Sequence, residues 1–515
     1  MEKTISGIAV NDIATTDEIT FAPIATNFQI PLCKKAVMSE ISEEFILPDY
    51  LPEIRRLLRV IPNIPIPSHY TGADISEFSG NIGWNILYVC GDGTLSEAYF
   101  STPYEASVEI DDNSATEYVM FVDTVPESIS AKVIAPRKTS IRARLSHNIK
   151  VYGDEVSKDI ASETDDIKKL YKVIPSIKIL SGTDNSVELV DSISVGENEK
   201  IVSKLGTVAI YEALPTDDGV VCKGNVCVKM IIQNKDSKAY STEKNIPFTS
   251  YVPLETEGDA WKCSAYGKVD DIEIEETEST KDIKIRMTVL ANAIRNQPSR
   301  ITADIFSTKQ VLAPVFKNIS LPCSLCTDIF DFSHEGSLNI EGLPEGAEAI
   351  DVITTAKGEN ITLENGKYIL SGKCKYNVLY GSDNEYSVRE SEFPFSCELA
   401  NGFEYPEDFM ADISVRSAKV RSEGENIAFS SNLCASVNVI GITPITAVEN
   451  ISFEGEIPPR SSAFTVAYTF DGDSLWDIAK RYSVDPVSLA NANGLKNLAR
   501  IDDSTILSDV KYIII

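Results

Sequence analysis

The sequence predicts a mainly β protein, in which three repeated antiparallel β-sandwich or barrel-like units precede a small strand–helix–helix–strand module. Three observations carry this prediction. A glycine-led pattern occurs at residues 80–88, 224–232 and 372–380. Within each copy, apolar residues recur at every second position, which is the period of a β-strand. Helical spacing of apolar residues replaces this alternation close to the C-terminus, after residue 474.

The length and composition favour several globular domains. A usual domain holds roughly 100–200 residues, so 515 residues are too many for one ordinary core. Hydrophobic residues make up 43% of the chain, enough to bury several cores. Acidic residues outnumber basic ones 77 to 47, and the net charge of −30 repels a phosphate backbone. The sequence therefore disfavours a nucleic-acid partner and leaves solubility, or a basic partner, as the role of the charge.

The N-terminal residues contain no apolar stretch of signal-peptide length, and no later stretch reaches the roughly 18–20 apolar residues of a membrane span. We therefore expect no membrane span and a location in the cytoplasm of the producing cell. The ten cysteines lack the dense spacing of a disulfide framework and are expected to be buried. Cys323 and Cys326 have no second pair, and His334 is the only histidine nearby, so we predict no metal site.

Each repeat runs from its glycine through a turn aspartate to a proline–aromatic pair. The pairs are Pro103-Tyr104, Pro247-Phe248 and Pro394-Phe395. They lie 23 and 24 residues after the glycine in the first two copies, and one residue sooner in the third. The polar run after each strand predicts a hairpin that returns the chain to this pair.

The alternation assigns two faces to each repeated strand. The even positions after the glycine are all apolar or aromatic: Ile82, Trp84, Ile86, Tyr88; Val226, Val228, Met230, Ile232; Cys374, Tyr376, Val378, Tyr380. The odd positions begin polar or small and become apolar only at Leu87, Ile231 and Leu379. One face is therefore expected in a core and the other in water, as in antiparallel sheets.

A short helix is predicted to open the first unit. Asp49 can cap it, Pro52 suits its first turn, and apolar residues from Leu51 to Leu58 share one face. We expect this helix to pack against the first unit.

The repeats resemble the SPOCS domain of endospore-forming bacteria. The resemblance rests on the strand–turn–Pro–aromatic pattern and on Leu47-Pro-Asp-Tyr-Leu-Pro-Glu-Ile54 ahead of the first copy. It divides the chain into an N-terminal segment, 1–32, and SPOCS-like repeats at 33–160, 170–298 and 299–455. The role of residues 1–32, and the face of each repeat that meets a partner, stay open.

The pattern changes after a proline-containing linker at 456–463. Residues 464–470 alternate as a strand, and Ser474 with Asp477 forms a capping box that opens a helix. Asp485 and Pro486 open a second helix, which Gly494 ends. A final strand runs to residue 515, so the order is β-α-α-β.

This layout at 464–515 is similar to LysM modules. The matching stretches are Gly472 to Tyr482 and Leu489 to Leu495. The resemblance implies a shallow groove that usually binds N-acetylglucosamine-containing glycans, such as peptidoglycan or chitin. Carried over to this chain, the groove is lined by Gly472, Asp473, Ser474 and Leu475 on one side and by Ile501 and Asp502 on the other.

Two features of the module favour a protein ligand over a glycan. Asp502-Asp503-Ser504 stands where glycan-binding members have a Pro-Gly-Gln-like turn, and added bulk and charge disfavour a sugar there. Trp476 lies one residue off the apolar stripe of its helix, and a partly exposed tryptophan is a common interface anchor. The alternative is that Trp476 covers only the core of the module.

No catalytic constellation is found in the sequence. His69, His147 and His334 lie in different contexts, and no phosphate loop, zinc-binding helix or nucleophile elbow occurs. We therefore predict no enzyme, no cofactor and no metal.

Three SPOCS-like units and a terminal LysM resemble clostridial spore-assembly proteins. This resemblance implies a non-catalytic scaffold in coat and cortex morphogenesis, at the forespore surface in the mother-cell cytoplasm. Its LysM would dock to an ATP-hydrolysing morphogenetic protein, stage IV sporulation protein A. The alternative is a cell-envelope protein whose LysM binds peptidoglycan or a chitin-like glycan. Exposed edge strands also leave self-association open.

Overall fold

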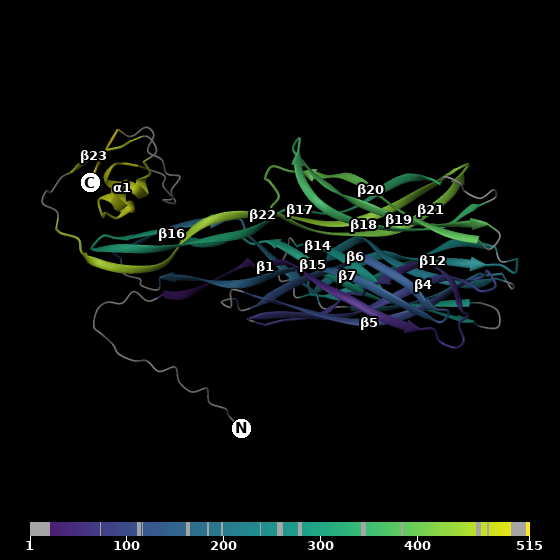
Figure 1. Ribbon diagram of the computed structural model, residues 1–515. Coiled ribbons are helices and arrows are strands. Elements are labelled where there is room, and N and C mark those ends of the chain that lie inside the picture. Colours follow the sequence, from purple (N-terminus) through teal and green to yellow (C-terminus); the bar gives the residue numbers. More distant parts are fainter. Residues whose placement is uncertain are drawn as a thin grey trace, which may run out of the picture.

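The computed structural model describes residues 21–72, 74–110, 115, 117–160, 165–182, 185–196, 199–236, 238–254, 261–276, 281–340, 347–382, 385–459, 465–470, 473–495 and 511–515. These residues form antiparallel sheets followed by two short helices near the C-terminus (Figure 1). The predicted mainly β fold is confirmed. Among the described residues, no helix combines the length and apolar character needed to cross a bilayer.

Unit 1 contains two sheets. The first has the order β1 (Phe21–Ile46), β7 (Lys138–Ile160), β6 (Tyr118–Ala135). The second is centred on β4 (Ile75–Cys90), which pairs with β2 (Ile54–Asn63), β3 (Ser68–Thr71) and β5 (Leu95–Glu109).

Unit 3 repeats this plan without the short extra strand. Its first sheet has the order β17 (Gln310–Asn339), β22 (Asn426–Glu456), β21 (Asp408–Glu423). Its second has the order β18 (Glu348–Glu364), β19 (Lys367–Ser382), β20 (Glu385–Asn401).

Unit 2 follows the same order with its outer strands broken. The second sheet is β11 (Lys200–Pro215), β12 (Gly219–Gln233), β13 (Ala239–Pro253). In the first, β9 (Ile177–Ser181) and β10 (Asn185–Ile193) both pair with β15 (Lys281–Asn296), which also pairs with β14 (Lys262–Glu276). Beyond them, β8 (Ile167–Ile174) pairs with β16 (Ser299–Ser307) as a separate two-stranded ribbon. The units are defined by strand pairing, so unit 1 includes β1 from Phe21 and unit 2 includes β16, which the sequence-based division places in the N-terminal segment and in repeat 3.

The repeated glycine lies opposite the repeated aromatic residue in all three units. The cross-strand partners are Gly80 and Tyr104, Gly224 and Phe248, and Gly372 and Phe395. A Cβ placed on any of these glycines would come 2.8 Å from its aromatic partner. The glycine therefore leaves space for the ring to cross its backbone, which explains why the two residue types recur together.

One face of the repeated strands is buried in a core, as the alternation predicts. The opposite face is only partly in water, because Gly83, Cys227 and Asn377 are also buried on it. All twelve even-position residues lie in the core of their own unit, and Trp84, Val228 and Tyr376 are completely buried. The odd-position residues Leu87, Ile231 and Leu379 are also buried, but they meet one another in a cluster shared by the three units. Equivalent residues of the three repeats therefore join the units.

A buried ion pair reinforces this junction. Arg59 of unit 1 donates to Asp351 of unit 3 at 2.6 Å, and the two side chains are 2% and 1% exposed. Lys229 of unit 2 lies 3.4 Å from the same carboxylate. Burial alone would raise the pKa of Asp351, but the two cations hold it below its ordinary value. One carboxylate therefore links all three units.

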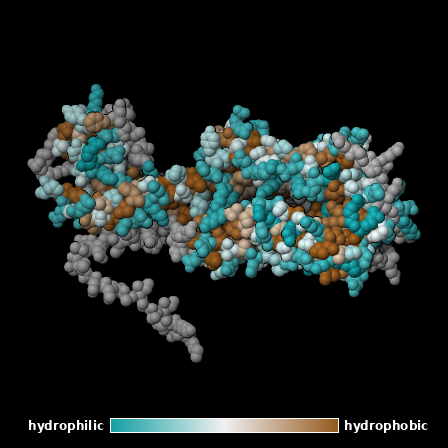
Figure 2. Space-filling view, viewed as in Figure 1, coloured by the Kyte–Doolittle hydropathy of each residue, from teal (hydrophilic) through white to brown (hydrophobic). Residues whose placement is uncertain are grey.

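The first and last strands of each unit continue beyond the sandwiches as ribbons, which run together towards the C-terminal module (Figure 1). The ribbons pack through Phe28 of unit 1, Ile174 and Ile301 of unit 2, and Leu321 and Ala447 of unit 3. Figure 2 shows apolar side chains on this narrower part of the molecule, whereas the surface of the three units mixes polar and apolar side chains. The ribbons therefore form a shared stem.

The predicted helix at the start of unit 1 is wrong. Residues 49–50 form a turn, and Ile54 begins strand β2, which pairs with β4. Arg137 donates to the carbonyl oxygens of Pro48 and Leu51, and Tyr88 donates to that of Pro52. Side chains from distant strands thus bind carbonyl groups of the proposed helix segment, and sheet pairing overrides the local helix signals.

Candidate functional site

The C-terminal module pairs two short strands and packs two helices against them. Strand β23 (Val466–Tyr468) is antiparallel to β24 (Tyr512–Ile514). Helix α1 spans Leu475–Arg481 and α2 spans Pro486–Ala492. The predicted order of elements is therefore found in the described residues.

The helix ends have the predicted caps. The backbone N–H of Asp477 donates to Ser474 Oγ at 3.1 Å, and the N–H of Ser474 donates to the Asp477 carboxylate at 3.2 Å. Asp485 accepts from the N–H of Ser488 at 2.8 Å. Gly494, with φ of +66°, adopts the left-handed conformation expected after α2.

The structure describes one side of the predicted groove. Leu475 is completely buried, Ser474 is buried as the helix cap, and Asp473 accepts from the N–H of Phe470 at 3.0 Å. Asp473 also forms an ion pair with Arg481 at 3.2 Å. Gly472, Ile501 and Asp502 lie outside the described residues, so the groove as a whole stays a prediction.

Trp476 does not have the partial exposure expected from its place on α1. It is 3% exposed, because the β8/β16 ribbon covers it. Its ring packs edge-on against Phe306 of β16, with centroids 5.0 Å apart and planes at 68°. Its indole N–H donates to Asp304 at 2.8 Å. Trp476 therefore anchors the module to the chain's own ribbon.

Charged contacts surround this aromatic contact. Lys480 of α1 donates to both oxygens of Asp304, at 2.6 and 2.8 Å. Lys168 of β8 pairs with Asp485, the α2 cap, at 2.7 Å. Burial alone would raise the pKa of Asp485, but hydrogen bonds from Lys168 and Ser488 hold it below its ordinary value. Both helices of the module are thus tied to the ribbon of unit 2.

Leu170, Asp304 and Phe306 are functional candidates that the sequence did not reveal. Leu170 and Phe306 are 4% and 5% exposed and share one apolar cluster with Leu475 and Ile478. Within β8 and β16 these residues resemble any others of a two-stranded ribbon. Their partners lie some 170 positions or more along the chain, for example 172 positions between Asp304 and Trp476. No local pattern could have signalled them.

The outer face of the two-stranded sheet stays open. Tyr468 and Tyr512 lie directly opposite each other and are 72% and 59% exposed. Phe470, which follows β23, is 70% exposed. The described part of the module therefore offers an aromatic surface on its strands, while the ribbon covers the Trp476 side of α1.

One histidine contacts a serine, which is an arrangement found in nucleophilic enzymes. His147 Nε2 lies 2.7 Å from Ser39 Oγ, and its Nδ1 lies 3.0 Å from Thr124 Oγ1. The ring is completely buried beside Phe78 and Tyr104, and burial lowers the pKa of His147. A hydroxyl takes the place of the carboxylate that orients a catalytic histidine. This contact is therefore a hydrogen-bonded part of the unit 1 core.

The cysteines and carboxylates give no metal centre within the described ranges, where no three His, Cys, Asp or Glu side chains converge. Burial raises the pKa of Cys222 and of Cys434 to about 12, which keeps these thiols protonated and weakly nucleophilic. The pair Cys323 and Cys326 lies in strand β17, and both residues are buried.

Comparison with known proteins assigns the C-terminal module to a recognised class. A family model described as the LysM domain matches residues 471–502. None of the curated proteins matches the chain. LysM is a binding module and carries no catalytic machinery of its own, and its usual ligands are glycans such as peptidoglycan. The chain therefore joins a β body of three units to a LysM-like binding module.

Proposed function

We propose that this chain is a non-catalytic scaffold of the spore envelope, which acts in coat and cortex morphogenesis through its LysM module. The proposal is supported by the order of three SPOCS-like repeats and a terminal LysM, which resembles clostridial spore-assembly proteins of the SipL type. On this proposal the chain works at the forespore surface, in the mother-cell cytoplasm.

The observation that carries the proposal is the attachment of the module to the β body. Trp476, Lys480 and Asp304 hold α1 against the β8/β16 ribbon, and the ribbons of all three units pack together. A ligand of the module is therefore kept at a fixed place relative to the three units. Fixed placement reduces the orientational freedom lost when further partners assemble, which is an advantage for a scaffold.

The proposed partner is stage IV sporulation protein A. The resemblance implies this partner, and a protein ligand suits the acidic Asp502-Asp503 pair better than a sugar would. The exposed aromatic side chains Tyr468, Phe470 and Tyr512 are of the kind that anchors protein interfaces. Self-association through exposed strands is a further proposal.

A peptidoglycan or chitin-like glycan is the second candidate ligand. The LysM match at 471–502 favours it, because the family binds N-acetylglucosamine-containing glycans. The open tyrosine pair Tyr468 and Tyr512 could also stack on sugar rings. In this case the β units would act as a stalk.

A binding comparison with the full-length chain separates the two candidates. The full chain is needed because Leu170 and Phe306 complete the apolar core of the module. We expect it to bind purified stage IV sporulation protein A and to stay in the supernatant with purified peptidoglycan. Sedimentation with peptidoglycan and no binding to the protein would establish the glycan candidate instead. Binding to neither would refute both.

A variant pair ties the binding to the module. We expect Tyr468→Ser to weaken binding, because Tyr468 is the most exposed aromatic side chain described on the module. Tyr405→Ser is the matched control, since Tyr405 lies on unit 3 and is 77% exposed. Fluorescence imaging of a fusion protein during sporulation tests the location, and a diffuse signal throughout would contradict it.

A further inference from the structure

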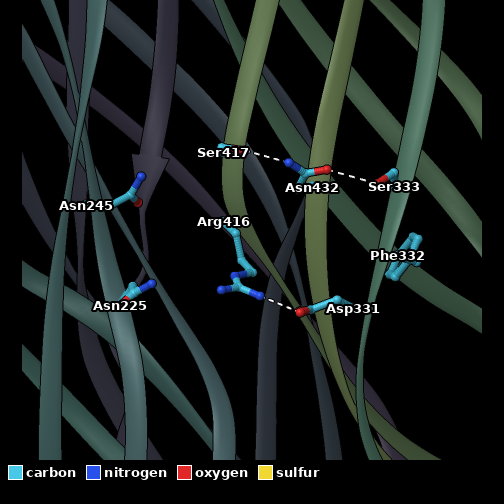
Figure 3. Close-up of a pocket in the computed structure, with 8 residues that line it drawn as sticks. All are labelled: Asn225, Asn245, Asp331, Phe332, Ser333, Arg416, Ser417 and Asn432. Atoms are coloured by element: carbon cyan, nitrogen blue, oxygen red, sulfur yellow. Dashed lines mark hydrogen bonds and ion pairs between the residues drawn. The ribbon is translucent and has the colours of Figure 1, made fainter.

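A second candidate binding site lies between unit 2 and unit 3, away from the LysM module. It is a cavity of about 440 Å³, open to solvent, and strands of both units line it (Figure 3). Small-molecule sites usually have volumes of roughly 300–1,000 Å³. The cavity is therefore large enough for a ligand of one or two sugar rings.

The polar groups of the unit 3 wall of this cavity are held in place by contacts with one another and with Tyr211 of unit 2. Arg416 of β21 forms an ion pair with Asp331 of β17, and its guanidinium lies 5.4 Å from the ring centre of Tyr211. Asn432 of β22 donates to Ser417 Oγ at 3.1 Å and accepts from Ser333 Oγ at 2.9 Å. These polar groups are therefore positioned before any ligand arrives, which lowers the entropy cost of binding.

The unit 2 wall presents two amides. Asn225 of β12 and Asn245 of β13 lie on neighbouring strands and face Arg416 across the cavity (Figure 3). Neither amide is hydrogen-bonded to another group of the described structure, whereas the polar side chains of the opposite wall are paired. Each amide offers one acceptor oxygen and two N–H donors. Two unused hydrogen-bonding groups thus face a prearranged polar wall.

The chemistry of the lining selects the class of ligand. Seven of the eight lining residues are polar, and Phe332 is the exception. Sites for apolar ligands have mostly hydrophobic linings, so this one suits a ligand rich in hydroxyl groups. Asp331 offsets the charge of Arg416, and a net charge of −30 disfavours an anion. We propose that the cavity binds a short neutral saccharide, with Asn225 and Asn245 bonding its hydroxyl groups.

This site is independent of the ligand of the LysM module. It would give the scaffold a second attachment point, on the β body. The amides of the site belong to unit 2 and the hydrogen-bonded polar groups opposite them to unit 3. A saccharide bound between them would therefore hold the two units in their present relative position.

Calorimetric titration of the full chain tests the proposal. The probes are N,N′-diacetylchitobiose and maltose as neutral disaccharides and glucuronic acid as an acidic sugar. We expect a neutral disaccharide to bind, and the double variant Asn225→Ala/Asn245→Ala to weaken binding about tenfold or more through the loss of its hydrogen bonds. Asn360→Ala is the control, because Asn360 is exposed on β18 outside the cavity.

The other outcomes overturn the proposal. Binding that survives the double variant but is lost in Tyr468→Ser would place the sugar on the LysM module. Binding of glucuronic acid alone would contradict the neutral class. No binding of either disaccharide at concentrations on the order of 10 mM would remove the site altogether. Thermal unfolding of each variant checks that the fold is retained.

Discussion

Replacing Phe306 with alanine removes the ring that packs edge-on against Trp476, and we expect this change to release the LysM module from the β8/β16 ribbon. Phe306 is 5% exposed and belongs to the ribbon, so its loss leaves the residues of the module itself intact. The ion pair between Lys480 and Asp304 stays in the variant, but a partly exposed pair contributes little.

The expected size of the effect follows from the contacts of Phe306. Burying a phenylalanine side chain contributes about 1.5–3 kcal/mol, and an aromatic pair adds about 0.5–1.5 kcal/mol. The sum is roughly 2–4.5 kcal/mol, and about 1.4 kcal/mol corresponds to a tenfold change in population. The undocked population should therefore rise by roughly 30- to 1,600-fold.

Hydrogen exchange of the tryptophan indole groups measures this population. The Trp476 N–H is protected only while it donates to Asp304, whereas the Trp84 N–H donates to Thr102 inside unit 1. In Phe306→Ala we expect exchange at Trp476 to accelerate by the stated factor and exchange at Trp84 to stay unchanged.

The matched control is Phe316→Ala, because Phe316 lies on strand β17 and is 46% exposed. We expect no change in the exchange of Trp476 in this variant. Unchanged exchange at Trp476 in Phe306→Ala as well would refute the proposed anchoring role.

Three further predictions concern the β body. Gly372→Ala should lower the free energy of unfolding by about 1–3 kcal/mol, and by more than Gly80→Ala does. The Cβ added at Gly372 meets a backbone oxygen at 2.1 Å, whereas the Cβ added at Gly80 meets only the side chain of Tyr104, which can move. The midpoints of urea unfolding give the ranking. Burial raises the pKa of Glu97 to about 7, so between pH 4.5 and 7 its carboxyl is protonated in the folded state and ionised in the unfolded state, and the free energy of unfolding falls as the pH rises. In urea unfolding, Glu97→Gln should remove this contribution to the pH dependence. Arg59 and Lys229 hold the pKa of Asp351 below its ordinary value, so the stability that its ionised form contributes is present at neutral pH and lost in acid. Asp351→Asn should lower the free energy of unfolding by about 3–5 kcal/mol at pH 7 and weaken its acid dependence, and equal acid dependence in both proteins would contradict the role of the pair.

The alternation in the repeats predicted the core face of the central strands because the side-chain direction in a strand depends only on position. The sequence also showed that Leu87, Ile231 and Leu379 are apolar although they lie on the face expected to contact water. Their purpose could not be predicted, since they meet only when three units are placed together. The failure at residues 49–58 had a related cause, because distant residues such as Arg137 bind the carbonyl groups there.

The candidate site shows the same division between local and distant signals. The capping box at Ser474 and the turn at Gly494 were predicted because each depends on a few adjacent residues. The environment of Trp476 was not, because a ribbon of unit 2 provides it. Local sequence thus predicted the build of the module but not its attachment.

The central claim is that the LysM module is held on a rigid body formed by the three repeats. Small-angle X-ray scattering of the full-length chain tests it most directly. We predict a profile that a single arrangement reproduces, with the module against the β8/β16 ribbon as in Figure 1. A profile that requires many positions of the module around its linker would contradict the claim.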